Sequence, residues 1–530
     1  MHHCLTIDKI LERIAGFVAA YSPDDSNRHR MEELRINISD KKSLLSFILT
    51  CRTFAELGLD VLWRRLDTIF PLAFAFFPNV SPRLKATDHS TKVIGFVRIP
   101  GPEDWIQFSR YARRLKTLVH SHNALCNVDT RFLAEFSLHR RTINLFPNLS
   151  ALSWRDSRQD RFPYISLFMG PSLTQVDIMI FSEDMYIAFW DVLRHSAPAI
   201  RIIYIHVVEL ELSNLALDSL TNALQSLKQL RGLCNSVPLI DGGLELSLGH
   251  LDYLSSIPTL QFLQYQFQVK PNLDMAREVA TTSEEGFPSL EGLAVHIRSD
   301  DAMDLLCIYM KHLRLPKLTE FSVCFYQQPL AVQLLQLCEA LANKCQLKTV
   351  IIKSQCIDWN TSIPYIITDS TVESLFTLPL TSSFGLINLP HKVTAHSLSK
   401  MATSWPNLTK LAIGFNFSPS TVPYDLIQVQ DLDVFAGKLP RLSFLLITLD
   451  MKVTDSLKSQ LSVRADCHSA SNALELNIMH TVLPDTLAQT QIAAYLTGLF
   501  PNVQVEGHDP KIEEFKTLIE LFKQVRGVAN

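Results

Sequence analysis

The chain is poor in glycine, with 17 glycines among 530 residues. Loops that wrap a phosphate need clustered glycines, because only a residue without a Cβ lets the backbone approach the phosphate closely. The sequence contains neither a G-x-G-x-x-G pattern nor a G-x-x-x-x-G-K-[ST] pattern, and its one adjacent pair is Gly242-Gly243. This argues against a nucleotide-binding fold.

Patterned cysteines and catalytic motifs are missing as well. None of the 10 cysteines forms a C-x-x-C pair, and several occupy apolar positions, where a thiol acts as a small hydrophobic group. There is no G-x-S-x-G and no H-E-x-x-H motif, and His2-His3 alone makes a weak metal site. His120, His206 and His296 fall in different repeats. We therefore expect no enzymatic activity, no metal and no cofactor.

Long apolar runs and a strong charge imbalance are also absent. No run reaches the roughly eighteen apolar residues of a membrane-spanning helix, and residues 1–8 are too polar for a signal peptide. The net charge is -4. The basic patch Arg110, Arg113, Arg114 and Lys116 is interpreted as a solvated helix face rather than a nucleic-acid site. We expect an intracellular protein of the cytoplasm or nucleus, with no membrane or nucleic-acid partner.

One phrase recurs along the chain, with the pattern apolar-Pro-x-Leu-x-x-apolar-x-apolar. Its leucine, here called the motif leucine, returns about every thirty residues, a period typical of stacked repeats that cannot bury their apolar faces alone. Clear copies are FPNLSALSW from Phe146, FPSLEGLAV from Phe287, LPKLTEFSV from Leu315, WPNLTKLAI from Trp405 and LPRLSFLLI from Leu439.

Each copy of the phrase also predicts local structure. The apolar alternation after the motif leucine indicates a strand, because side chains of a strand alternate between its two faces. The proline ends the preceding helix and is expected at the first residue of the strand, so that Pro288 begins a strand and Leu290 is buried. Amphipathic segments between the strands predict helices.

This order of strand, turn, helix, turn and proline resembles the leucine-rich-repeat family in a long-period, irregular form. The resemblance implies an α/β solenoid over residues 111–509, with a parallel inner sheet and outer helices. Residues 71–110 would form a linker or first irregular repeat, and residues 510–530 a C-terminal capping helix.

Residues 1–70 do not follow the repeat. The stretch LTCRTFAELGLDVLWRRLDTIFPL, residues 49–72, follows a leucine-rich helix and contains the patterns T-C-[RK]-x-F and L-W-[RK]-x-L. These patterns resemble the F-box, a three-helix segment, especially its fungal version. The resemblance implies docking on the Skp-type adaptor of a cullin–RING ubiquitin ligase; the alternative is a helical cap over the first repeat. The residues matched to adaptor binding are Leu5, Ile7, Ile10, Leu11, Ile14, Leu45, Ile48, Leu49, Cys51, Phe54, Leu62 and Trp63.

In a leucine-rich-repeat arc, the residues between the apolar positions of each strand face the concave side. Here that row mixes charges, amides and aromatic rings, as expected of a protein-binding surface. The positions assigned to target binding are Arg155, Asp177, Tyr204, His206, Gln264, Gln266, His296, Ser322 and Lys353.

These resemblances together predict a substrate-recognition subunit of a cullin–RING ubiquitin ligase. Its N-terminal module would bind the adaptor and its repeats would bind a target protein, while other subunits perform the chemistry. The alternative is a leucine-rich-repeat interaction scaffold with no role in ubiquitin transfer. Co-purification with the adaptor would separate the two.

Overall fold

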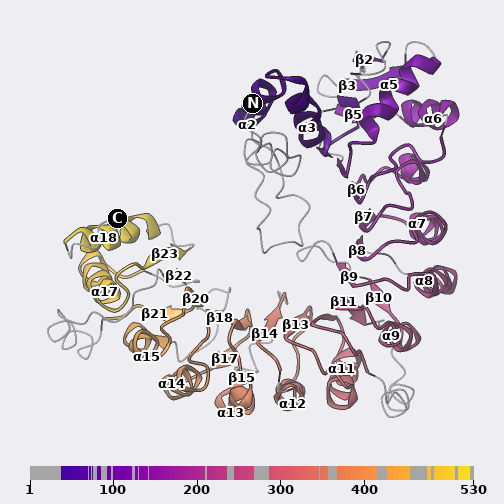
Figure 1. The fold of residues 1–530 in the computed structure, drawn as a ribbon. Coiled ribbons are helices and arrows are strands. Elements are labelled where there is room, and N and C mark those ends of the chain that lie inside the picture. The colour runs from indigo at the N-terminus through magenta and orange to yellow at the C-terminus, as the bar shows by residue number, and fades with distance from the viewer. Residues whose placement is uncertain are drawn as a thin grey trace. The chain divides into compact units, whose positions relative to one another are not determined.

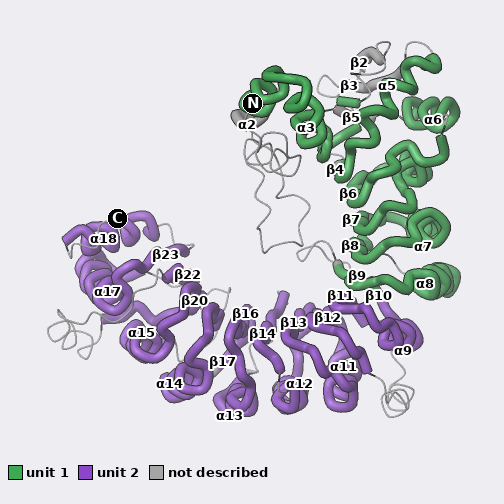
Figure 2. The backbone as a smooth tube through the Cα atoms, in the orientation of Figure 1, with its two compact units in different colours: residues 1–244 green, residues 245–530 purple. Residues whose placement is uncertain are grey.

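The computed structural model describes residues 38–69, 71–72, 75, 80–84, 92–96, 100–121, 126–128, 130–140, 142–208, 210, 212–235, 244–267, 286–344, 346–355, 367–414, 427–453, 474–478, 483–507 and 511–525. The chain divides into two compact units, residues 1–244 and residues 245–530, called unit 1 and unit 2 (Figure 2). Each unit is α/β, with parallel strands followed by helices (Figure 1).

Unit 1 carries a run of parallel strands in the order β1-β4-β6-β7-β8-β9. The strands are β1 (Arg65–Leu66), β4 (Thr117–Ser121), β6 (Ala151–Arg155), β7 (Gln175–Ile180), β8 (Ile202–Val207) and β9 (Gly232–Asn235). The helices are α2 (Ile38–Ile48), α3 (Arg52–Trp63), α5 (Pro102–Ala112), α6 (Thr130–His139), the 3-10 helix η3 (Gln159–Leu167), α7 (Glu183–Ser196) and α8 (Asn214–Ser226). A smaller sheet joins β2 (Val80–Leu84), β3 (Lys92–Phe96) and β5 (Cys126–Val128), with β2 and β3 antiparallel.

Unit 2 continues the pattern in the order β11-β12-β13-β14-β16-β18-β20-β22-β23, with β10 beside β11. The strands are β10 (Glu245–Leu246), β11 (Phe262–Phe267), β12 (Gly292–Ile297), β13 (Glu320–Phe325), β14 (Thr349–Ser354), β16 (Ser383–Ile387), β18 (Lys410–Gly414), β20 (Phe444–Ile447), β22 (Glu475–Ile478) and β23 (Gln504–Gly507). Two short parallel pairs are β15 (Ile367–Thr368) with β17 (His391–Lys392), and β19 (Ile427–Gln428) with β21 (Leu449–Asp450).

The helices of unit 2 follow its strands in the same alternating order. They are α9 (Leu248–Ser255), α11 (Asp300–His312), α12 (Ala331–Ala342), α13 (Asp369–Glu373), η4 (Ser374–Thr377), α14 (Ala395–Ser404), η5 (Val429–Leu432), α15 (Asp433–Lys438), α17 (Thr486–Leu499) and α18 (Ile512–Val525). The last helix, α18, lies where a capping helix was predicted and packs against α17 and β23. None of the described helices has the length and apolar character needed to cross a membrane.

The prediction of an α/β fold with parallel strands and outer helices is confirmed in each unit, and both arrays are consistent with a repeat solenoid. Within each unit the helices lie along one face of the strands (Figure 1). Leu152, Val176 and Ile203 stand side by side on the helical face and are fully buried. The opposite face, here called the open face, carries the alternate residues, such as Ser153 and Asp177.

The recurring phrase folds into a tight turn that ends in the buried motif leucine. In the first clear copy, the amide of Leu149 donates to the carbonyl of Phe146 at 3.1 Å, and Leu408 bonds Trp405 in the same way at 3.0 Å. Proline suits the second position of such a turn, because its fixed φ matches that position and no N–H is needed there.

The expectation that the proline begins the strand is wrong. Pro288 lies in the turn, and β12 begins only at Gly292. The amide of Glu291 donates to the carbonyl of Gln261 in the neighbouring repeat at 2.7 Å, and proline, which lacks an N–H, could make no such bond. Leu290 is 0% exposed, as predicted.

Neighbouring repeats also meet at their turns. A Cβ added to Gly286 would lie 2.0 Å from the carbonyl oxygen of Arg314, which belongs to the next repeat. Because that contact is with backbone, no side chain can move aside to relieve it. Glycine is therefore required where one turn passes over the next.

Removing the motif leucine should destabilise unit 2. Leu290→Ala leaves a cavity in a fully packed site, so we expect a loss of about 2–5 kcal/mol in the free energy of unfolding. Leu330→Ala is the matched control, because Leu330 is 47% exposed and should cost less than about 1 kcal/mol. Urea denaturation of the two variants beside the wild type measures both, and equal losses would mean that Leu290 is not a packing residue.

Candidate functional site

The α2–α3 segment has a small apolar core of its own. Leu44 of α2 is fully buried and Val61 of α3 is 8% exposed, with Phe47, Ile48 and Leu62 packed against them. These contacts fix the two helices against each other.

The helices approach most closely at Gly58. A Cβ at this position would lie 2.3 Å from Cγ1 of Ile48, far inside contact distance, so any side chain here would displace that isoleucine. Beside this crossing, the rings of Phe47 and Phe54 stack with their centroids 4.6 Å apart. Phe54 is therefore a packing residue as well as a predicted adaptor contact.

Two leucines at the end of α2 remain outside this core. Leu45 is 48% exposed and Leu49 is 82% exposed. The Leu49 amide donates to the Leu45 carbonyl at 3.0 Å, so the two side chains lie one helical turn apart on the same face. The other described residues of the predicted adaptor surface, Ile48, Cys51, Phe54, Leu62 and Trp63, are half-buried. The predicted first-helix residues Leu5, Ile7, Ile10, Leu11 and Ile14 lie outside the described residues.

Ion pairs fasten α3 to α5 and the turn that follows it. Arg114 donates to the carboxylates of both Glu56 and Asp60, and its Nη1 also donates to the Glu56 carbonyl at 3.0 Å. Arg110 adds a second bond to Glu56 at 3.1 Å. The hydrogen bond from Arg114 is the main reason that the pKa of Glu56 lies below its usual value.

This geometry corrects the interpretation of the basic patch as a solvated face at one residue, Arg114. The Arg114 side chain is only 11% exposed and ion-paired, whereas Arg113 and Lys116 are exposed as expected. The sequence gives no indication of these pairs, because the partners lie more than fifty positions away. A groove of about 500 Å³ lies between α3 and α5, lined by these charged residues.

Helix α3 continues directly into the sheet of unit 1. Strand β1 pairs in parallel with β4, with Arg65 opposite Thr117, and the Thr117 amide donates to the Arg64 carbonyl at 2.9 Å. The Trp63 ring packs edge-on against Tyr111 of α5, with centroids 5.3 Å apart. A partner bound to α3 would therefore be held in a fixed orientation relative to this sheet.

The open face of unit 1 is largely closed by its own side chains. Asp177 Oδ2 accepts hydrogen bonds from Ser153 Oγ at 3.0 Å and Arg155 Nε at 3.0 Å. Asp177 is 3% exposed, Tyr204 8% and His206 0%. Of the predicted target contacts in this unit, only Arg155 keeps substantial exposed surface. The reason is that parallel strands lie about 5 Å apart, so neighbouring side chains cover one another.

The open face of unit 2 is more accessible. Gln264, Ser322 and Lys353 are half-buried, whereas Gln266 and His296 are buried. Gln264 Nε2 donates to His296 Nε2 at 3.0 Å. The register places His296 beside Cys324 and Cys324 beside Lys353. A role of all these residues in target binding stays a prediction.

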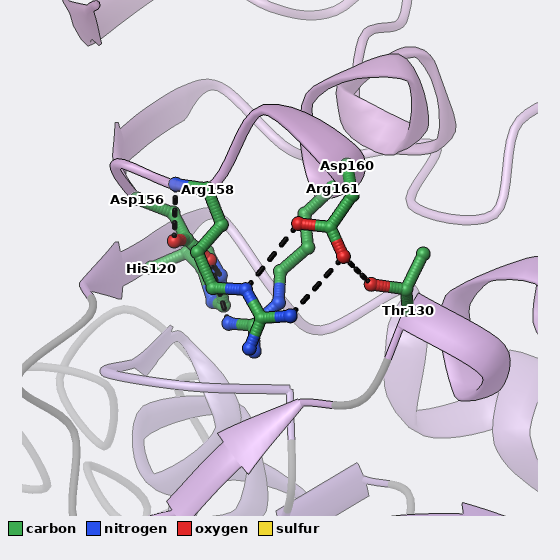
Figure 3. Close-up of polar contacts among 6 residues, drawn as sticks. All are labelled: His120, Thr130, Asp156, Arg158, Asp160 and Arg161. Atoms are coloured by element: carbon green, nitrogen blue, oxygen red, sulfur yellow. Dashed lines mark hydrogen bonds and ion pairs between the residues drawn. The ribbon is translucent and has the colours of Figure 1, made fainter.

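A buried ionic cluster joins β4, β6 and η3 in unit 1 (Figure 3). Asp156 Oδ2 lies 3.0 Å from His120 Nε2 and 2.8 Å from Arg161 Nη1, and Asp156 Oδ1 accepts from the Arg158 amide at 3.1 Å. Asp156 is 0% exposed and Arg161 1%. Neither residue was assigned from the sequence, because a charged pair five positions apart carries no signal of burial.

This cluster stabilises the local fold and is unsuited to acid–base catalysis. Burial alone would raise the pKa of Asp156, but hydrogen bonds from His120 and Arg161 and the charge of Arg161 hold it below its usual value. A carboxylate so firmly ionised is a poor proton carrier at neutral pH. It fixes η3, which contains Pro163, at the place where other repeats have an α-helix.

Four of the described thiols are poor nucleophiles. Burial raises the pKa of Cys234, Cys307 and Cys338 to about 12, and that of Cys324 to about 11, and only the thiolate form reacts. Among the residues that the structure describes, no group of three or more His, Cys, Asp or Glu side chains is placed to hold a metal ion.

No protein-family model matches the chain, and no curated protein matches it in sequence. Among solved structures, the chain is similar to the Rad7 and Elc1 complex of yeast, with 15% sequence identity and a TM-score of 0.31 over 59% of this chain and 80% of that chain. A likeness this distant carries no conclusion about function. The resemblance to F-box and leucine-rich-repeat proteins therefore rests on the residues themselves.

Removing the Arg114 side chain should loosen α3. We expect Arg114→Gln to speed amide hydrogen exchange in α3 roughly five- to thirtyfold, because charge-assisted hydrogen bonds to two carboxylates are lost. Hydrogen exchange followed by mass spectrometry measures this. Arg113→Gln is the control, since Arg113 is an exposed neighbour in the same turn. Equal exchange in both variants would show that the ion pairs do not hold α3.

Acid should weaken the protein between pH 6.5 and pH 4 through His391. Burial lowers its pKa to about 4, whereas the unfolded chain titrates near about 6.5. In that interval the unfolded chain binds a proton that the folded chain does not, so stability present above pH 6.5 is lost as the pH falls. The full shift corresponds to roughly 3 kcal/mol.

Urea midpoints at pH 7.5 and pH 5.0 test this pH dependence. His391→Gln should lose less stability on acidification than the wild type, while His195→Gln, at an exposed position, should behave as the wild type. A wild-type pH dependence in His391→Gln would contradict the assignment.

Proposed function

We propose that this chain is a substrate-recognition subunit of a cullin–RING ubiquitin ligase. The α2–α3 segment docks on a Skp-type adaptor, and the open faces of the repeats bind a target protein. The chain performs no chemistry of its own; it supplies proximity and orientation for subunits that do. Its place of action is the cytoplasm or the nucleus.

The observation that carries the proposal is the pair of exposed leucines at the end of α2, Leu45 within the helix and Leu49 directly after it. Leu45 and Leu49 lie beside a core that buries Leu44 and Val61. They are exposed large apolar side chains among polar residues such as Ser46 and Thr53. An exposed apolar pair next to half-buried aromatic residues is typical of a protein-binding patch. The same segment carries the Thr50-Cys51-Arg52-x-Phe54 pattern that resembles the F-box.

The attachment of α3 to the sheet supports the proposal that the chain orients a target relative to the adaptor. Arg114 and the β1–β4 pairing fix α3 to the sheet. A receptor of this kind needs such rigidity, because a target is modified only when it is held at a defined place relative to the bound adaptor. A flexible linker at this point would give up that orientation.

The leucine pair provides the decisive experiment. The double variant Leu45→Asp/Leu49→Asp should weaken binding to a Skp-type adaptor at least about thirtyfold, the effect of losing more than 2 kcal/mol of apolar contact. Binding is measured by isothermal titration with the full-length chain, and circular dichroism checks its folding.

A matched control separates a specific patch from general loss of apolar surface. Leu330→Asp/Ile143→Asp changes side chains that are 47% and 83% exposed, close to the 48% and 82% of the leucine pair. The control should bind the adaptor as the wild type does. A wild-type chain that binds no adaptor at tens of micromolar would favour the scaffold function, without a ubiquitin-ligase role.

A further inference from the structure

Three neighbouring strands of unit 2 bring a basic cluster together at their carboxyl ends. The register aligns His296 of β12 with Cys324 of β13, and Cys324 with Lys353 of β14. Two positions further along, Arg298 and Tyr326 follow on the same open face. The guanidinium carbon of Arg298 lies 5.1 Å from the centre of the Tyr326 ring. The cluster thus combines two cations, Arg298 and Lys353, with an aromatic ring and an imidazole.

The Arg298 guanidinium is fixed but has unused donors. Its Nε and one Nη are buried atoms with no hydrogen-bond partner among the described residues. Buried donors without an acceptor cost free energy unless something accepts from them. Stacking on Tyr326 holds the guanidinium plane in place, so these donors are already oriented.

The positive charge of the cluster is not neutralised locally. Neither Arg298 nor Lys353 forms an ion pair within the described part of unit 2. Burial first, and then the charges of Lys353 and Arg298, lower the pKa of His296 to about 4. His296 is therefore neutral, and its ring nitrogens are taken up by Gln264 Nε2 at 3.0 Å and the Tyr326 hydroxyl at 3.1 Å.

On the open face of unit 1, by contrast, the cation has a carboxylate partner within the protein. There, Arg155 donates from its Nη2 to Asp177 at 2.8 Å, and the carboxylate is buried beside it. Arg298 and Lys353 occupy comparable open-face positions with no such carboxylate. The difference indicates that the counter-charge at the unit 2 cluster comes from a bound group.

We propose that Arg298 and Lys353 form a binding site for an oxyanion, a carboxylate or a phosphate, carried by a segment of the target protein. Arg298 supplies oriented N–H donors and Lys353 supplies a mobile positive charge. Tyr326 and the neutral His296 lie beside them. This inference rests on the proposed function in one respect, namely that the open face binds the target. It names the chemistry that the face recognises.

Anion binding by the full-length chain tests the site directly. The probes are a fluorescein-labelled hexaglutamate peptide and a labelled serine peptide carrying one phosphoserine, followed by fluorescence anisotropy. Arg298→Gln/Lys353→Gln should weaken whichever probe binds more tightly by about tenfold or more, because charge-assisted hydrogen bonds are lost. Competition with inorganic phosphate and with acetate distinguishes a phosphate site from a carboxylate site.

Lys410→Gln is the matched control, because Lys410 is an exposed lysine at the amino end of β18, which β16 separates from β14. It should bind the probes within about twofold of the wild type, the change expected of a distant screened charge. Thermal denaturation confirms that each variant is folded. Failure of both probes to bind the wild type, or equal binding by the double variant, would overturn the site.

The two proposals fail separately. The Arg298→Gln/Lys353→Gln variant should keep full adaptor binding, and the Leu45→Asp/Leu49→Asp variant should keep full anion binding. Loss of adaptor binding alone leaves the oxyanion site standing, and loss of anion binding alone leaves the docking segment standing. An Arg298 variant that also loses the adaptor would show a general folding defect, and the single variant Lys353→Gln then tests the site.

Discussion

In both units, most repeats have a hydrogen-bonded turn with a leucine buried beneath it, and the stacking of the repeats depends on this arrangement. Parallel strands need a crossover between them, and the turn decides where each crossover ends and the next strand begins. Leu149, Leu230, Leu290 and Leu408 are all at most 1% exposed. Each fills space between a helix and its neighbours, so a repeat taken alone could not bury it. The array is therefore held together by contacts that only stacking completes.

The periodicity of the sequence predicted these strands because alternation and a thirty-residue spacing are local and repetitive signals. The same reasoning placed Pro288 wrongly at the first residue of the strand. A residue without an N–H suits a turn as well as the start of a strand, and the pairing with the neighbouring strand shows its first bond only at Glu291, which donates to Gln261.

The candidate sites were less predictable because they depend on distant partners. Glu56 and Arg114 lie 58 positions apart, and no pattern along the chain indicates that they meet. The alternate strand residues were correctly placed on one face, but their burial was not foreseen. Asp177 is covered by Ser153 and Arg155 of the neighbouring strand, and that coverage depends on register rather than on residue type.

The bonds around Asp177 also bear on how this surface can change during evolution. A single substitution at Asp177 would leave both the Arg155 guanidinium and the Ser153 hydroxyl without this hydrogen-bond acceptor, because both donate to the same carboxylate oxygen. Replacements on β6 and β7 must therefore arise together or in a compensating order. Lys353 has no such partner within the described residues, so its replacement would leave no neighbouring side chain without a hydrogen-bond partner. As far as folding is concerned, substitutions on the open face are therefore expected to need compensation where side chains satisfy one another, and to be tolerated singly where each stands alone.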